Sequence, residues 1–180
     1  MIKKLIKKII NNLGFDLKRY NSHQKKINLD DLLKDYVSSN PIIFDVGGNK
    51  GQSIEKYLQI FDKPIIHSFE PIKSEYEYMC SKFKNNKNIF LNNFALGDKT
   101  EEKEFNVTAK TGNSSFNKIN PGTDWLKLRS KQFNISEEGY VTSVQKVNVI
   151  QLDDYCKDIN IDFIDVLKID TQGYEDKVLK

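Results

Sequence analysis

The sequence predicts an α/β fold, with a mostly parallel sheet and helices on both of its faces. Short apolar runs alternate with helical segments over residues 41–98, and the connections between them are short, as in strand–helix–strand units. The apolar runs are continuous rather than alternating, which is typical of strands buried on both faces. With 180 residues, the chain is long enough for one domain with a sizeable core.

The first 40 residues are predicted to form a basic, amphipathic helical arm ahead of a domain at 41–180. Residues 1–26 carry eight basic side chains and one acidic side chain, whereas the remaining residues carry twenty and twenty-four. Within residues 1–13 the isoleucines and leucines fall on one helical face and the lysines on the other. Two interpretations stay open: the helix lies on an anionic membrane, or it docks on its own domain or a partner subunit.

The uneven charge also bears on the partners and the compartment. A nucleic-acid enzyme carries its positive charge around the active site, and here the body is mildly acidic, so we expect no nucleic-acid partner. Cys80 and Cys156 are too few and too far apart for a disulfide framework or a metal set. We therefore expect reduced thiols in a cytoplasmic protein, with membrane association as the alternative that the arm leaves open.

Each element follows from its local pattern. A helix near 29–37 precedes Pro41, where the domain begins. Alternating polar and apolar residues at 103–107 and 144–149 predict an antiparallel insertion between the third and fourth strands. In order, the predicted elements of the domain are a strand at 42–46, a helix at 53–61, a strand at 65–70, a helix at 74–83, a strand at 89–96, the insertion, a short helix from 153, a strand at 165–170 and the start of one more helix.

The insertion contains a polar loop, TGNSSF at residues 111–116. Loops of this kind carry binding and catalytic residues, so the loop is a candidate rim of the active site. An ordinary surface connection is an equally good interpretation.

A glycine-rich turn, DVGGNKG at residues 45–51, joins the first strand to the first helix. Glycines allow a ligand to approach the backbone closely, and the helix N-terminus offers free N–H groups. Glu70 ends the second strand, where an acid can accept hydrogen bonds from both hydroxyls of a ribose. The glycine spacing fits neither a dinucleotide fingerprint nor a P-loop. Asp45 would repel a pyrophosphate but suits a ligand with a cationic end, such as S-adenosylmethionine.

Four motifs occur in order at predicted strand ends: DVGGNKG at 45–51, FEP at 69–71, NFALGD at 93–98 and LKIDTQGYE at 167–175. With them the chain resembles the FkbM-type methyltransferases over residues 41–180. The resemblance implies a Rossmann-like methyltransferase fold and an S-adenosylmethionine-dependent enzyme that methylates a hydroxyl of a sugar, glycan or natural product. Genes of this family often accompany surface-polysaccharide biosynthesis.

The resemblance also implies roles for single residues. Asp45, Gly47, Asn49 and Gly51 would line the methionine part of the cofactor. Glu70, followed by Pro71, would hold the ribose, and Asn93 and Ala95 would flank the adenine. Asp170 would lie beside the transferable methyl group. The chain departs from the family at Gly48, where alanine is more common, and at Lys50, where the family more often has an apolar residue.

A sugar hydroxyl has a very high pKa and therefore benefits from a general base or a metal. Asp170 is the best candidate for this task, with Glu175 or Gln172 assisting. The structural alternatives are an Asp170 that caps the following turn and a Glu175 exposed on a helix. No His/Cys cluster has structural metal spacing, so a divalent metal is not supported by the sequence. His67, in the middle of a strand, is expected to be a core residue.

The resemblance ends shortly after the fourth strand, whereas the family continues with further strands. We therefore expect a domain that is incomplete at its C-terminus, with an unpaired apolar strand at the edge of the sheet. This expectation leaves a second interpretation of the function open: a truncated, non-catalytic remnant, or a subunit that depends on a partner.

Overall fold

The structure is a computed structural model that describes residues 28–180. The helix predicted within residues 1–13 lies outside the described residues. The chain divides into two units, Met1–Leu32 and Leu33–Lys180, and the boundary falls within α2 (Leu29–Tyr36). The predicted division at residue 40 stays a prediction. Within residues 28–180, no helix is long and apolar enough to cross a membrane.

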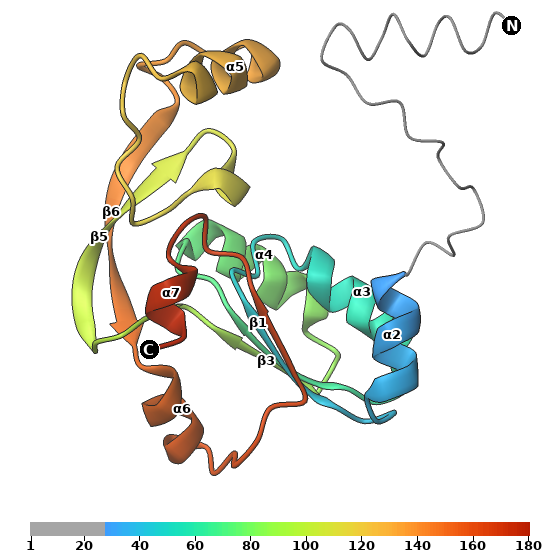
Figure 1. Cartoon of the computed structure of the whole chain (residues 1–180). Helices are drawn as coiled ribbons and strands as arrows, with labels where there is room; N and C mark the ends of the chain where they lie inside the picture. The colour runs from blue at the N-terminus through green and yellow to red at the C-terminus, as the bar shows by residue number, and fades with distance from the viewer. Residues whose placement is uncertain (1–27) are drawn as a thin grey trace, which may run out of the picture. The chain divides into compact units, whose positions relative to one another are not determined.

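The second unit is built on a parallel sheet of four strands in the order β3-β2-β1-β7 (Figure 1). The strands are β1 (Ile42–Val46), β2 (Ile65–Phe69), β3 (Ile89–Asn92) and β7 (Val166–Ile169). All three pairings are parallel, and β7 lies at an edge of the sheet. The predicted α/β fold with a mostly parallel sheet is confirmed.

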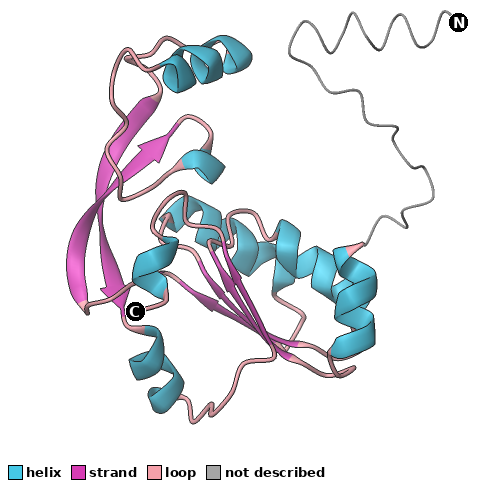
Figure 2. Cartoon of the chain, in the orientation of Figure 1, coloured by secondary structure: helices cyan, strands magenta, loops and turns pink. Residues whose placement is uncertain are grey.

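Helices cover both faces of this sheet (Figure 2). On one face α3 (Gln52–Ile60) and α4 (Lys73–Phe83) bury Ile54 and Met79 against Ile43 of β1. On the other face α6 (Leu152–Asp158) and α7 (Glu175–Val178) pack against Phe44 and Phe69. Each fully buried side chain of this size stabilises the fold by about 1.5–3 kcal/mol, so the two clusters hold the strands and helices together.

The insertion forms a second sheet of three strands in the order β4-β6-β5. Its strands are β4 (Ala95–Leu96), β5 (Glu101–Thr108) and β6 (Val141–Ile150), and β5 pairs antiparallel with β6, as predicted. The short 3₁₀ helix η1 (Thr111–Asn113) follows β5, and α5 (Asp124–Phe133) lies near the far end of the β5–β6 ribbon (Figure 1).

Two features of the insertion differ from the prediction. The expected strand at 89–96 is two strands, because β3 belongs to the first sheet and β4 to the second. Between them the Asn93 side chain donates hydrogen bonds to the carbonyls of Glu70 and Pro71, which anchors the chain where it leaves the first sheet. Helix α5 was not predicted. Its capping residue Thr123 accepts a hydrogen bond from the backbone N–H of Leu126, and this cap was a signal available in the sequence.

Candidate functional site

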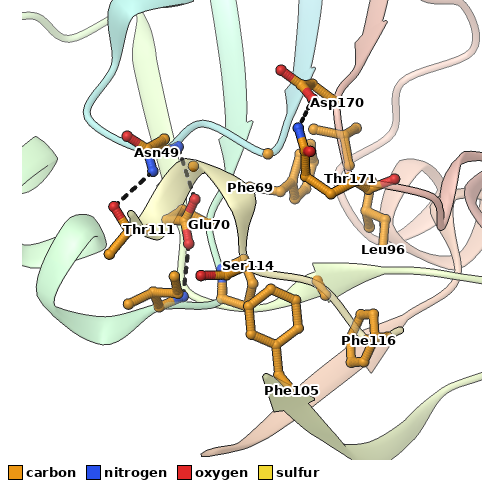
Figure 3. A pocket seen from close by; sticks show the side chains of 17 residues that line it. Asn49, Phe69, Glu70, Leu96, Phe105, Thr111, Ser114, Phe116, Asp170 and Thr171 are labelled. Carbon is orange, nitrogen blue, oxygen red and sulfur yellow. Dashed lines mark hydrogen bonds between the residues drawn. The ribbon is translucent and has the colours of Figure 1, made fainter. Parts of the chain in front are cut away.

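A pocket lies at the carboxyl ends of β1, β2 and β7, the edge of a parallel sheet where α/β proteins bind ligands (Figure 3). Its empty space is about 600 Å³, which includes the part at the mouth that is open to solvent. The lining residues are Val46, Gly47, Asn49, Phe69, Glu70, Pro71, Ile72, Ala95, Leu96, Phe105, Thr111, Gly112, Ser114, Phe116, Asp170, Thr171 and Gln172. In Figure 3 Glu70 and Thr111 lie on one side and Asp170 and Thr171 on the other.

The glycine turn brings bare backbone to the floor of this pocket. The N–H groups of Gly47 and Gly48 both donate to the carbonyl of Phe69, at 3.0 and 3.1 Å. Gly47 has a φ of +83°, and a Cβ built on it would lie 2.1 Å from the carbonyl oxygen of Asp170. A Cβ on Gly48 would lie 2.2 Å from the Ser68 Oγ. Gly47 therefore excludes a side chain, whereas a side chain at Gly48 would require the Ser68 hydroxyl to move.

Glu70 follows β2 and is 4% exposed, and its carboxylate contacts the backbone of the glycine turn. Its Oε2 accepts a hydrogen bond from the backbone N–H of Asn49 at 2.7 Å, and its Oε1 accepts one from that of Ile72 at 2.8 Å. Burial raises the pKa of Glu70 to about 7, against the opposing effect of these two donors. Each carboxylate oxygen can accept a further hydrogen bond, so the group can still bind two ligand hydroxyls.

Asp45 is fully buried and does not line the pocket. Its Oδ1 lies 3.0 Å from the Nζ of Lys168, and its Oδ2 accepts a hydrogen bond from the Ser68 hydroxyl at 3.2 Å. Burial raises the pKa of Asp45, and the Lys168 ammonium works in the opposite direction. Sequence reasoning did not identify Lys168. The available signal was a lysine within an apolar strand, because a partly buried ammonium group needs a hydrogen-bond acceptor or a carboxylate beside it.

Asp170 lies at the mouth of the pocket with its side chain 57% exposed. Its Oδ1 accepts a hydrogen bond from the side-chain amide of Gln172 at 2.8 Å. Its Oδ2 lies 4.0 Å from the Lys168 ammonium. The carboxylate is therefore held by the Gln172 amide, with the Lys168 ammonium at a longer distance, and it stays largely exposed to solvent.

Glu175 does not line the pocket but braces the turn that follows Asp170. Its carboxylate accepts hydrogen bonds from the backbone N–H groups of Thr171 and Gly173, at 2.9 and 3.0 Å. Burial on its own would raise the pKa of Glu175, but these N–H groups and its own outweigh burial and hold the pKa below its usual value. Its predicted assisting role in catalysis stays a prediction.

The loop at residues 111–117 forms a wall of the pocket and joins its two sides. The Asn49 side chain donates a hydrogen bond to the Thr111 hydroxyl at 3.1 Å, next to the glycine turn. At the other end, Ser115 and Asn117 donate to the carbonyls of Gln172 and Gly173, each at 2.9 Å. The structure thus places this loop at the pocket rather than on a remote surface.

The remaining predicted residues do not line the pocket. Gly51 precedes α3 with a φ of +77°, and its Cα faces the ring of Phe83. The Asn93 side chain donates hydrogen bonds to the carbonyls of Glu70 and Pro71, which follow β2. His67 is 5% exposed and lies 2.8 Å from the Tyr155 hydroxyl, and burial lowers its pKa to about 4. It is the core residue that the sequence predicted.

Of the predicted cofactor-binding and catalytic residues, the structure brings six to the pocket: Gly47, Asn49, Glu70, Pro71, Ala95 and Asp170. It does not bring Asp45, Gly51, Asn93 or Glu175 there. Among the described residues, no three His, Cys, Asp or Glu side chains are grouped so that they could hold a metal ion.

Residues 45–180 match the family model described as the methyltransferase FkbM domain. The chain belongs to the FkbM methyltransferase family. It is also 23% identical over 145 residues to the 2-O-methyltransferase NoeI of Sinorhizobium fredii, an alignment that covers 78% of this chain and 56% of the relative. This FkbM chain thus spans about half the length of the curated relative that it matches. The predicted resemblance is confirmed, and the Rossmann-like arrangement of its sheet is the one expected for such a domain.

Proposed function

We propose that this FkbM-family chain is an S-adenosylmethionine-dependent O-methyltransferase that acts on a hydroxyl of a sugar, glycan or natural product. The observation that carries the proposal is the buried Glu70 carboxylate at the end of β2, next to a glycine turn without room for a Cβ. The similar protein of Sinorhizobium fredii is a 2-O-methyltransferase, which supports an oxygen acceptor.

The residues of the pocket fit this cofactor. Glu70 offers both carboxylate oxygens to the ribose hydroxyls, and the apolar side chains of Ile72 and Phe105 suit an adenine. The backbone of Gly47 and the side chain of Asn49 are available to the methionine part. The Asp45 carboxylate pairs with Lys168 and does not line the pocket. Its predicted direct contact with the cofactor stays a prediction.

When bound, S-adenosylmethionine supplies an electrophilic methyl group with a good leaving group. The protein therefore chiefly aligns the acceptor and excludes water. Asp170, oriented by Gln172, accepts the proton of the acceptor hydroxyl at the mouth of the pocket. The loop at 111–117 shields the pocket from solvent on the side of the insertion.

The test is a calorimetric titration of the chain with S-adenosylhomocysteine at pH 8, where Glu70 is ionised, and with NAD as a competing cofactor. We expect saturable binding of S-adenosylhomocysteine, and at least tenfold weaker binding by Glu70→Gln, because the amide nitrogen can accept a hydrogen bond neither from a ribose hydroxyl nor from the backbone N–H that the replaced oxygen held. Glu77→Gln, an exposed acid on α4, is the matched control. Tighter binding of NAD, or equal affinity of Glu70→Gln, would overturn the proposal.

A further inference from the structure

Three polar side chains form a row across the sheet directly below the glycine turn. Asp45 of β1 is in register with Ser68 of β2 on one side and with Lys168 of β7 on the other. Because register partners in neighbouring parallel strands point to the same face, the three side chains meet, with Asp45 hydrogen-bonded to Ser68 and ion-paired with Lys168.

The Lys168 ammonium also contacts groups other than Asp45. It donates a hydrogen bond to the carbonyl of Gly47 at 2.9 Å and lies 3.5 Å from the carbonyl of Val46. It also lies 3.0 Å from Asp45 and 4.0 Å from Asp170. Its three N–H donors therefore serve the glycine turn as well as the buried carboxylate.

The contact with Gly47 fixes the orientation of one peptide group. The peptide between Gly47 and Gly48 has its carbonyl bonded to Lys168 and its N–H bonded to the Phe69 carbonyl. The next peptide has its N–H bonded to Glu70. Glycine loses more conformational freedom on folding than any other residue, so a turn made of glycines depends on such external bonds to keep one conformation.

We propose that Lys168 is a positioning residue, which holds the glycine turn and orients Asp170, and that it is not only the counter-ion of Asp45. The inference rests on the proposed function, because the turn and Asp170 are its proposed cofactor-binding and catalytic elements. Pairing with Asp45 also neutralises the ammonium, so that Lys168 can bond the turn without repelling a cationic ligand.

The role of Lys168 as counter-ion can be separated from its positioning role in a variant that lacks the buried Asp45 carboxylate. Asp45→Asn removes the carboxylate that needs a counter-ion, and Asp45→Asn/Lys168→Met then removes the contacts of the ammonium with the turn, with Asp170 and with the side-chain amide oxygen at position 45. Lys168→Arg keeps the charge. Residue-resolved hydrogen exchange of the turn amides (Gly47, Gly48 and Asn49) is compared with that of the β5–β6 ladder, which reports on global opening.

We expect the turn amides of Asp45→Asn/Lys168→Met to exchange at least tenfold faster than those of Asp45→Asn, while the ladder amides of the two variants agree within threefold. Lys168→Arg should stay closer to the wild type than Lys168→Met does. Equal exchange of the turn in Asp45→Asn and the double variant would overturn the proposal and leave Lys168 as a counter-ion.

Affinity for S-adenosylhomocysteine gives the second measurement. The double variant should bind it at least tenfold more weakly than Asp45→Asn does, and equal affinity would count against the positioning role. If the wild type binds no S-adenosylhomocysteine while the turn amides still behave as expected, the proposed cofactor is wrong and the positioning role of Lys168 stands.

Discussion

At the scale of single residues, Glu70 combines a structural and a proposed binding task. Its two oxygens accept backbone N–H groups on either side of the pocket floor, and burial holds its pKa near 7. The folded protein therefore retains a proton on Glu70 over a pH range in which the unfolded chain has already released it. The proton is bound more tightly by the folded state, so the stability of the fold must depend on pH through this residue.

The sign and range of this dependence follow from the two pKa values. Between about pH 4.5 and pH 7, the free energy of unfolding should fall by about 3 kcal/mol on account of Glu70, and this contribution should be constant above pH 7. Glu70→Gln should lack this part of the slope. Urea denaturation of both proteins from pH 5 to pH 8 measures it, with Glu77→Gln as control. Parallel pH profiles for wild type and Glu70→Gln would contradict the raised pKa.

At the scale of elements, the loop at 111–117 connects the insertion to both sides of the pocket. Thr111 contacts the turn after β1, and Ser115 contacts the turn after β7. The loop therefore restrains two segments that belong to different motifs of the sequence. Its own conformation is restrained by the bond from the Thr108 N–H to the Ser114 hydroxyl at 3.0 Å.

The contact between Asn49 and Thr111 is the simplest part of this arrangement to remove. Thr111→Val keeps the shape of the side chain but loses the hydroxyl, and one such hydrogen bond contributes about 1 kcal/mol. We expect affinity for S-adenosylhomocysteine to fall about fivefold and hydrogen exchange at 111–117 to become faster. Thr100→Val, at an exposed position before β5, is the control. If Thr111→Val matched the control in both measurements, the loop would have no part in binding.

The sequence predicted the elements of the parallel sheet well and those of the insertion less well, for a physical reason. β1 lies at 42–46 as predicted, because a buried strand bounded by Pro41 and Gly47 needs only local signals. The end of β3 depends on Asn93, whose partners Glu70 and Pro71 are distant in sequence. Lys168 was missed because its partner Asp45 lies on another strand, and local patterns carry no strand order.

At the scale of the second unit, the pocket is shared by two sheets. The turns after β1, β2 and β7 supply Asn49, Glu70 and Asp170, while β4, β5 and the loop that follows β5 supply Ala95, Phe105 and Phe116. The β5–β6 ladder has no strand in common with the parallel sheet. A ligand in the pocket therefore contacts both sheets at once, and its binding free energy must stabilise their association.

Because both sheets line the pocket, a bound ligand should stabilise both of them against unfolding and hydrogen exchange. At a free concentration one hundred times the dissociation constant, S-adenosylhomocysteine should raise the free energy of unfolding by about 2.7 kcal/mol. Hydrogen exchange should slow in the β5–β6 ladder as well as in β1 and β2, because opening of either sheet releases the ligand. Glu70→Gln, with its weaker binding, should show a smaller effect at the same concentration. Protection confined to the parallel sheet would mean that the insertion does not take part in holding the cofactor.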